Sequence, residues 1–543
     1  MATAALPPIP SQILAPRAQV LIPRERLVGV TDFPLSGHCW DAAIIGSGIG
    51  GATVGAQLAS LGLSVAFLEK GRRIAAGIDA VDEVTAEARL KGGWWPHPIS
   101  QRRSDRRCER FFAPLGCAVG GTSIFYAAAL ERMDAADFQA LQTAGQIVPD
   151  WPVSFAEFAR FYDAAETLYR ARRMPIDEAK DRLSEWDLAF IERMRRSGLR
   201  PELLNVAVRY DAECQECIGK ICPRGCKADA VSACLDRALR EPACRIFEDC
   251  EVLSLEADGT RVRSLKVQHH GEQLEVRARA VVLAAGALHS PQILLRSRSE
   301  TWPRGLANSS DQVGRNLMFH TSDHFAVWAP QRLNRNGRQK KSLSVRDFYR
   351  DRGERLGYIQ SVGLEVRAGT VAVILKNLLR RRGLHNELLL KLLTNVPAHA
   401  VAGFLGAASV FAAMTEDDPM PENRIVLDSG EPDGASFRYT ISADLRRRAA
   451  ALYDNFARHV RPWRLARLSP ELGMNYGHAC GTCRFGNDPR TNVLDSNCRT
   501  HDIENLYVVD SSFMPRSGAV NPSLTIAANA LRVAPYIAAE LSA

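Results

Sequence analysis

The sequence predicts an α/β protein (α+β overall) with a dinucleotide-binding unit near its N-terminus. Residues 41–69 follow the order strand, glycine turn, helix, strand. Residues 279–297, RAVVLAAGALHSPQILLRS, have the pattern of a buried strand, a glycine turn and an amphipathic helix. The chain has 543 residues, which is too long for one small core and suits two large, intertwined domains.

The first glycine turn has a residue for each task of dinucleotide binding. Gly46 permits the tight turn, Gly48 lets the backbone approach a pyrophosphate, and Gly51 lets helix and strand pack closely. The helix that follows supplies amide donors for the phosphates. Glu69 ends the second strand, where a carboxylate should hold the ribose hydroxyls. This motif alone does not separate NAD from FAD.

Composition and charge narrow the class of protein and its partners. Hydrophobic residues make up 46% and charged residues 24%, as in soluble globular proteins. A formal charge of +8 spread over this length does not favour a nucleic-acid partner. Residues 1–35 are proline-rich and predict an extended lead-in without the pattern of a secretory signal. With 13 cysteines, an odd number, we expect mostly reduced thiols in a cytoplasmic protein.

Further motifs follow in order along the chain. Residues 116–132 read GCAVGGTSIFYAAALER, in which glycines indicate backbone packed against something flat or charged, beside two hydroxyl donors. Residues 313–320 read VGRNLMFH, and the C-terminal part contains GHACGTCRFG and NLYVVDSSFMPRSGAVNPSLTIAANALRVA. Together with GALHSPQILL, these segments resemble the glucose-methanol-choline (GMC) oxidoreductase family from about residue 40 onward.

The resemblance implies a discontinuous, Rossmann-like FAD-binding domain and a substrate domain built around an antiparallel sheet. We expect the FAD-binding domain to take residues 36–135, 240–325 and 470–543. The substrate-binding domain then takes 136–239 and 326–469, with a cysteine-rich segment at 214–226 and a helical insert at about 370–414.

The same resemblance implies an FAD-dependent oxidoreductase that oxidises a CH–OH group of an alcohol, sugar or polyol by hydride transfer to flavin N5. Removing the hydroxyl proton needs a base, and His478 in GHACGTCRFG matches the family's base. Asn521 in AVNPSLT matches the second catalytic position, where an amide orients the substrate oxygen. We expect a dehydrogenase rather than an oxidase, with an electron acceptor that the sequence does not identify.

The family motifs also imply the residues that contact FAD. We expect His289 and His320 to be structural and His501 to lie exposed in a polar loop. GGTSIFYAA contains no histidine, which excludes covalent attachment of FAD at that segment. The expected FAD contacts are Gly46, Gly48, Gly51, Glu69, Gly116, Gly120, Gly121, Thr122, Ser123, Val252, Gly286, Asp510, Asn521 and Pro522.

The segment ECQECIGKICPRGCKADA concentrates four cysteines, Cys214, Cys217, Cys222 and Cys226. Three interpretations stay open: a structural group of thiols or disulfides, an iron–sulfur cluster that relays electrons from FAD, and a zinc site. Their spacing matches neither a zinc ribbon nor the bacterial ferredoxin pattern. Some GMC dehydrogenases of sugars and long-chain alcohols have a similar segment.

Two alternatives remain beside these expectations. Residues 370–414 combine leucines at helical spacing with basic residues, which fits a helical pair over the substrate domain or a surface for a peripheral membrane or partner subunit contact. For function, an FAD-containing lyase of the same fold and a nicotinamide-dependent dehydrogenase compete with the CH–OH oxidoreductase. A flavin-containing protein with a dead site is disfavoured because His478 and Asn521 are both present.

Overall fold

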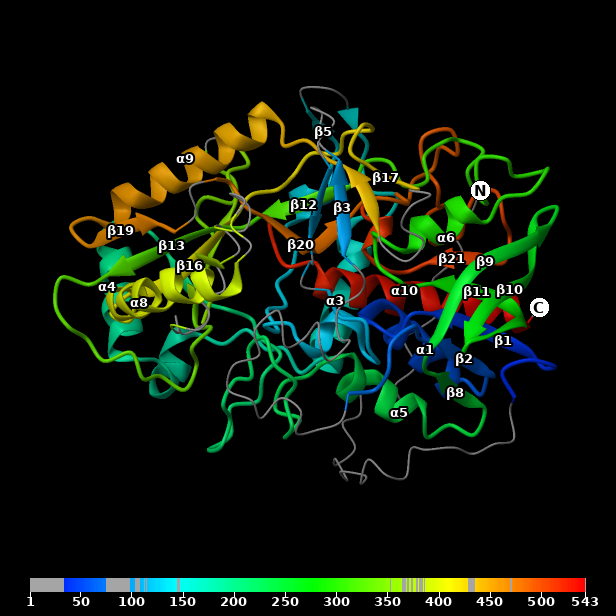
Figure 1. Ribbon diagram of the computed structural model, residues 1–543, viewed down its shortest axis with the longest axis horizontal. Helices are drawn as coiled ribbons and strands as arrows, with labels where there is room; N and C mark the ends of the chain where they lie inside the picture. The colour runs from blue at the N-terminus through cyan, green and yellow to red at the C-terminus, as the bar shows by residue number, and fades with distance from the viewer. Residues whose placement is uncertain are drawn as a thin grey trace.

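The largest sheet of this computed structural model lies in the right-hand part of the molecule in Figure 1. The structure describes residues 34–74, 98–102, 108–111, 113, 115–143, 147–351, 353–363, 368, 371–372, 375–376, 379, 384, 386–427, 435–468 and 471–542. The N-terminal lead-in therefore lies almost entirely outside the described residues, as do Arg380, Arg381 and Arg382 of the insert.

This sheet has seven strands in the order β8-β2-β1-β11-β10-β9, with β21 paired to β11. The strands are β1 (Cys39–Ile45), β2 (Val65–Leu68), β8 (Cys244–Phe247), β9 (Cys250–Asp258), β10 (Arg261–His269), β11 (Glu272–Leu283) and β21 (Leu506–Val508). β1, β2, β8 and β21 run parallel to the C-terminal part of β11, residues 277–283. The N-terminal part of β11, residues 272–276, forms an antiparallel meander with β10 and β9. The predicted Rossmann-like α/β fold is confirmed.

The register of the parallel strands brings distant motifs to one place. Ile45 at the end of β1 lies opposite Leu283 of β11, which in turn lies opposite Val508 of β21. The turns that follow these three strands therefore meet at the carboxyl edge, where α/β sheets bind their ligands. Apolar residues fill both faces here, since all four residues of β2 are buried.

Five helices of the described chain pack on this sheet or on one another beside it. They are α1 (Ile49–Ser60), α3 (Phe155–Leu168), α5 (Asp236–Ala238), α6 (Ser290–Arg296) and α10 (Ser523–Ser542). α10 packs against α1 and α3, and Figure 1 shows it running beside α1. α1 tolerates such close packing because it is rich in Gly and Ala; a Cβ on Gly55 would come within 2.2 Å of the Phe67 ring.

A second sheet is antiparallel throughout, with strand order β19-β13-β16-β15-β14-β7. Its strands are β7 (Pro201–Leu203), β13 (Asp323–Trp328), β14 (Leu343–Val345), β15 (Tyr358–Ser361), β16 (Ser409–Met414) and β19 (Arg464–Arg467). α4 (Glu185–Arg196) and α9 (Ala443–Val460) pack on it, with a core that includes Trp186, Phe190, Phe411 and Phe456. α8 (Glu387–Leu405) lies beside this sheet near β16, with Leu405 packed on Ala326 of β13 (Figure 1).

The described part of the chain also contains three small sheets. β12 (Met318–Thr321) pairs with β20 (Met474–Cys480) between the two large sheets. The others consist of β3 (Ile99–Arg102), β4 (Cys108–Phe111), β17 (Arg424–Val426) and β18 (Ser436–Arg438), and of β5 (Leu141–Gln142) and β6 (Ile147–Val148).

The expectation of a helical insert up to residue 414 is wrong at its C-terminal end. α8 ends at Leu405, and residues 409–414, SVFAAM, form strand β16 at the centre of the second sheet. The apolar run continues without a polar boundary, so helix and strand look alike in the sequence there. Pairing with β13 and β15 on both sides buries Phe411 and Ala413 and selects the strand.

Candidate active site

A cavity of about 590 Å³ extends from the first glycine turn to the antiparallel sheet. Gly46, Gly48 and Glu69 line one end, while Gln360 and Lys341 line the other. His478 and Asn521 also face the cavity. One elongated space therefore joins the predicted dinucleotide site with the predicted catalytic pair.

Glu69 holds two glycine segments together at the dinucleotide end. Its Oε2 accepts hydrogen bonds from the Ser47 amide at 3.0 Å and hydroxyl at 2.6 Å, and its Oε1 accepts one from the Gly71 amide at 2.9 Å. The Ser47 hydroxyl in turn accepts a bond from the Gly120 amide at 2.9 Å. Burial raises the pKa of Glu69, opposed by these bonds. The carboxylate thus fixes the turn and still borders the cavity.

The glycines of the cavity wall fit an elongated nucleotide. A Cβ on Gly48 or on Gly286 would meet no atom within 4 Å, although both residues line the cavity. Side chains at these two positions would project into space that the chain leaves open. Gly48 also precedes α1 as its N-cap, so the amide groups of a 12-residue helix begin at the cavity. These features fit the pyrophosphate of FAD.

Asp510 organises the wall opposite this turn. Its Oδ2 accepts bonds from the Gly286 amide at 2.9 Å and the Ser290 hydroxyl at 2.5 Å. Its Oδ1 accepts bonds from the Ser512 amide at 2.9 Å and hydroxyl at 2.5 Å. Asp510 therefore ties the turn after β11 to the turn after β21 and itself borders the cavity. Burial raises its pKa, and these bonds oppose the shift.

Most residues predicted to contact FAD line this cavity, with two exceptions. Gly51 lies outside the wall; a Cβ there would stand 2.1 Å from the Gly46 carbonyl oxygen, so its role is packing. Gly120 lies behind the wall and contributes its amide to Ser47. The lining includes Gly46, Gly48, Glu69, Gly116, Gly121, Thr122, Ser123, Val252, Gly286, Asp510, Asn521 and Pro522.

His478 is paired with a second histidine. The antiparallel pairing of β12 with β20 brings His320 beside it, and the two Nδ1 atoms lie 3.0 Å apart. The Nε2 of His320 lies 2.7 Å from the Gly518 carbonyl oxygen and 3.1 Å from that of Ser517. Carbonyl oxygens only accept, so His320 carries its hydrogen on Nε2 and presents an Nδ1 lone pair. His478 then donates from Nδ1, and its Nε2 is left as an acceptor.

Burial favours the neutral form of both histidines. Burial lowers the pKa of His320, opposed by its carbonyl partners. Burial, with smaller contributions from His320 and Lys341, holds the pKa of His478 well below its ordinary value of 6.5. A neutral imidazole with a free Nε2 lone pair is a base ready to take a proton. From the sequence we expect only a structural role for His320, and no sequence pattern indicates its contact with His478.

Asn521 presents an unused acceptor. Its Oδ1 is buried and has no hydrogen-bond partner in the structure. It stands just before α10, whose 20 residues begin at Ser523, and both residues line the cavity. Buried polar atoms are rarely left without partners, which indicates that a ligand group completes this site.

The antiparallel sheet supplies a polar row at the other end. Ala412 of β16 lies directly between His324 of β13 and Gln360 of β15 in the strand registers. Paired residues point to the same face of a sheet, and all three line the cavity. The small Ala412 leaves a hollow between two hydrogen-bonding side chains. The Oε1 of Gln360 is buried without a partner, and Lys341 lies beside it in the lining.

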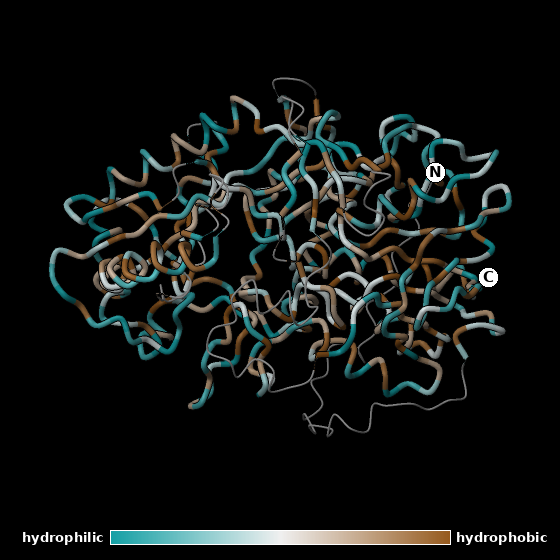
Figure 2. The backbone as a smooth tube through the Cα atoms, viewed as in Figure 1, coloured by the Kyte–Doolittle hydropathy of each residue, from teal (hydrophilic) through white to brown (hydrophobic). Residues whose placement is uncertain are grey.

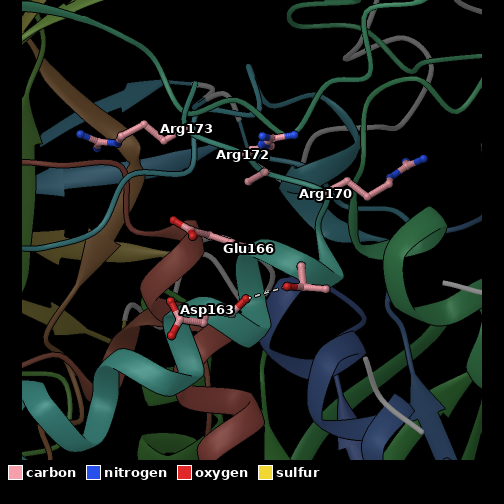
Figure 3. A pocket seen from close by; sticks show the side chains of 7 residues that line it. Asp163, Glu166, Arg170, Arg172 and Arg173 are labelled. Atoms are coloured by element: carbon pink, nitrogen blue, oxygen red, sulfur yellow. Dashed lines mark hydrogen bonds between the residues drawn. The ribbon is translucent and has the colours of Figure 1, made fainter. Parts of the chain in front are cut away.

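A second hollow, of about 600 Å³, lies on the surface around α3 (Figure 3). Three of its five charged side chains, Asp163, Glu166 and Arg173, belong to ion pairs: Arg132 bonds Glu166 and Asp163, and Arg173 bonds Glu131 and Glu202. None of the predicted site residues lines this hollow.

The cysteine-rich segment forms two thiol pairs. Cys217 hydrogen-bonds Cys222, and Cys214 hydrogen-bonds Cys226. All 13 cysteines of the chain are free thiols. Within the described residues, no three His, Cys, Asp or Glu side chains converge where they could hold a metal ion. The structural, iron–sulfur and zinc interpretations of this segment all stay predictions.

His501 is half-buried rather than exposed, because its Nε2 lies 3.1 Å from the Gly486 carbonyl oxygen. It lies outside the cavity wall.

The chain matches two models of one family, both described as GMC oxidoreductase. The N-terminal model covers residues 41–322 and the C-terminal model covers residues 419–530. The chain is 28% identical to 6'''-hydroxyparomomycin C oxidase of Streptomyces lividus, over 93% of this chain and 92% of that protein. It is 27% identical to the fructose dehydrogenase large subunit of Gluconobacter japonicus, over 92% and 98% of the two chains.

The fold is also that of solved structures. Pyridoxine 4-oxidase from Mesorbium loti superposes with a TM-score of 0.62 at 20% identity, over 92% of this chain and 98% of that one. A formate oxidase superposes with a TM-score of 0.64 at 15% identity, over 93% and 99%.

Proposed function

This chain belongs to the GMC oxidoreductase family, and we propose that it is a dehydrogenase of sugars or polyols that uses His478 as its base. It is an FAD-dependent oxidoreductase acting on the CH–OH group of a small-molecule alcohol or sugar. FAD supplies the hydride acceptor when bound. The chain's own residues must hold the cofactor, take up the hydroxyl proton and orient the alcohol.

The histidine pair is the observation that carries the proposal. His320 fixes the hydrogen of His478 on Nδ1, which leaves the Nε2 lone pair for the substrate hydroxyl. As the proton arrives, the imidazolium keeps its Nδ1 bond to His320. The direct test is turnover and bound FAD in His478→Ala, described in the Discussion.

Asn521 orients the alcohol in this proposal. Its amide nitrogen donates a hydrogen to the alcohol oxygen, while Oδ1, which has no protein partner in the structure, accepts from a further ligand group. An amide cannot act as the base at neutral pH. His478 alone therefore takes the proton, while Asn521 holds the oxygen in place.

The polar row of His324, Ala412 and Gln360 supports a substrate with several hydroxyl groups. The unused Gln360 acceptor and the Lys341 ammonium favour hydroxyls over an apolar chain, because leaving buried polar groups unpaired is costly. Ala412→Phe, which fills the hollow, should raise KM for sugars at least tenfold and leave a short primary alcohol little changed. Equal effects on both substrates would argue against this site.

Two observations support the dehydrogenase over the oxidase. The cysteine-rich segment at 214–226 is similar to that of some GMC dehydrogenases of sugars and long-chain alcohols. The chain is also 27% identical to the fructose dehydrogenase large subunit over 92% of its length. After anaerobic reduction by substrate, a quinone acceptor should restore the oxidised spectrum at least tenfold faster than air-saturated buffer. Faster recovery with O2 would identify an oxidase.

We also propose a cytoplasmic location. The 13 free thiols support a reducing compartment.

A further inference from the structure

α8 exposes an apolar surface that no other helix of the described chain matches. Seven of the eleven large hydrophobic residues that are exposed in the described part of the chain lie on it. They are Leu388, Leu389, Leu392, Leu393, Val396, Val401 and Phe404. Figure 2 shows the brown colour of this helix at the edge of the molecule. An exposed patch of this kind marks an interaction site.

The two sides of α8 have different surroundings. Leu390, Thr394 and Ala398 are buried at successive turns and face the protein. On the opposite side Leu388, Leu392 and Val396 are 70%, 67% and 77% exposed, again at successive turns. At the C-terminal end Leu405 and Ala408 pack on Ala326 of β13. One side is thus anchored on the second sheet and the other is apolar and open.

The buried side of α8 indicates whether this helix would lie on a membrane or cross it. α8 is the one helix in the described residues that is long and apolar enough to span a bilayer. A spanning helix would need lipid or other helices all around it, whereas Leu390, Thr394 and Ala398 are buried and Leu405 packs on Ala326 of β13. An apolar face opposite a packed face is the arrangement of a helix that lies in the membrane interface.

Basic side chains lie on and beside this helix. Lys391 is exposed on α8 itself. At the C-terminal end Arg464 lies over the rings of Phe404 at 5.2 Å and Trp328 at 5.5 Å. Arg335 donates to the Gly406 carbonyl oxygen. Basic residues around an apolar face complement anionic lipid headgroups, and Trp is favoured at the membrane interface.

We propose that the apolar face of α8 docks this protein peripherally on an anionic lipid bilayer. The leucine and valine side chains enter the headgroup–acyl boundary, while the surrounding Lys and Arg residues contact the headgroups. The surface belongs to the second sheet, because four residues after α8 the chain enters β16, whose Ala412 and Met414 line the cavity. Docking through α8 therefore leaves the FAD end of the cavity on the other part of the molecule.

Flotation of the FAD-loaded full chain with vesicles tests this proposal. Vesicles of phosphatidylglycerol and phosphatidylcholine in equal parts should carry the protein upward, and vesicles of phosphatidylcholine alone should carry at least fivefold less. The double variant Leu392→Glu with Val396→Glu should lose at least tenfold of the bound fraction, because two carboxylates would face the bilayer. Flavin absorbance of each variant reports that the chain is folded.

Ile147 provides the matched control. It lies outside α8, and its exposed fraction of 68% is close to the 67% of Leu392. The Ile147→Glu variant should therefore float like the unaltered protein. Equal flotation of the α8 double variant would overturn the proposal, as would failure of the unaltered protein to bind anionic vesicles. If the unaltered protein does not float but forms a dimer, and the α8 double variant is a monomer, this face binds a second copy of the chain instead.

Discussion

At the scale of single residues, the chemistry depends on where one hydrogen atom sits. The carbonyl oxygens of Ser517 and Gly518 hold the hydrogen of His320 on Nε2, and this arrangement directs the lone pair of His478 to Nε2. The motif around His478 could be identified from the sequence. The contribution of His320 could not, because it arises from the pairing of two strands 158 residues apart.

Replacing His478 by alanine should abolish most turnover while FAD stays bound. General-base catalysis contributes about 10²–10⁴-fold to rate, so kcat should fall by that order. His501→Ala, outside the cavity wall, is the control and should keep normal turnover. The measurements are kcat with a saturating substrate and the flavin content of the purified protein. Turnover near that of the unaltered enzyme would refute the role of His478.

His320 should act as a positioning residue. His320→Leu removes the acceptor for the His478 Nδ1 hydrogen, and we expect kcat to fall about 10–100-fold, as for other groups that orient a reactive histidine. His320→Gln keeps an oxygen acceptor and should recover part of this loss. If Leu and Gln variants behave alike while both bind FAD, His320 has only a packing role.

The depressed pKa of His478 predicts the acid side of the pH–rate profile. A lowered histidine pKa means that the neutral, base-competent form persists as pH falls through the ordinary value of 6.5. Activity assigned to this group should therefore be lost only below pH 6.5. The profile of kcat/KM against pH measures this directly. If kcat/KM already falls at or above pH 6.5 on the acid side, and His320→Gln moves this fall, a neutral His320–His478 pair is contradicted.

At the scale of elements, two glycines of the first glycine turn have different roles. The GxGxxG pattern predicts that Gly48 lets the backbone approach a pyrophosphate and that Gly51 lets helix and strand pack closely. The structure gives Gly48 open space toward the cavity and presses Gly51 against the backbone of Gly46. The packing adds that Gly51, also expected to contact FAD, lies outside the cavity wall.

The two glycines should therefore fail in different ways. Gly48→Val has an unstrained backbone and space for its side chain, so the apoprotein should lose about 1 kcal/mol or less while FAD binding is abolished. Gly51→Val would push against a carbonyl oxygen and should cost about 3 kcal/mol or more. Thermal unfolding and FAD titration of both apoproteins separate these outcomes. Tight FAD binding by Gly48→Val would contradict the placement of the cofactor.

The second sheet shows where prediction from sequence ends. Short strands such as β14 and β15 carry little periodicity, and β16 continues an apolar run from α8. The row of His324, Ala412 and Gln360 comes from three strands and exists only once their register is known. The resemblance to a family predicted an antiparallel sheet here, while the residues that face the substrate could not be deduced.

At the scale of the whole molecule, the site is assembled from segments that are far apart in the chain. Strands β1, β11 and β21 bring turns near residues 46, 285 and 510 to one edge, and β12 with β20 closes the catalytic side. The order of family motifs predicted this convergence. The exposed face of α8 was foreseen only as a choice between packing and docking, because a sequence does not reveal which side of a helix remains uncovered.

The most direct test of the central claim is the visible absorption spectrum of the anaerobically purified protein, before and after a panel of alcohols and sugars is added. We predict oxidised flavin bands that bleach with a sugar or polyol in the unaltered protein and remain in His478→Ala. Flavin bands that no compound bleaches would contradict the proposed sugar or polyol oxidation. A protein that takes up no flavin even after reconstitution with FAD would contradict the account as a whole.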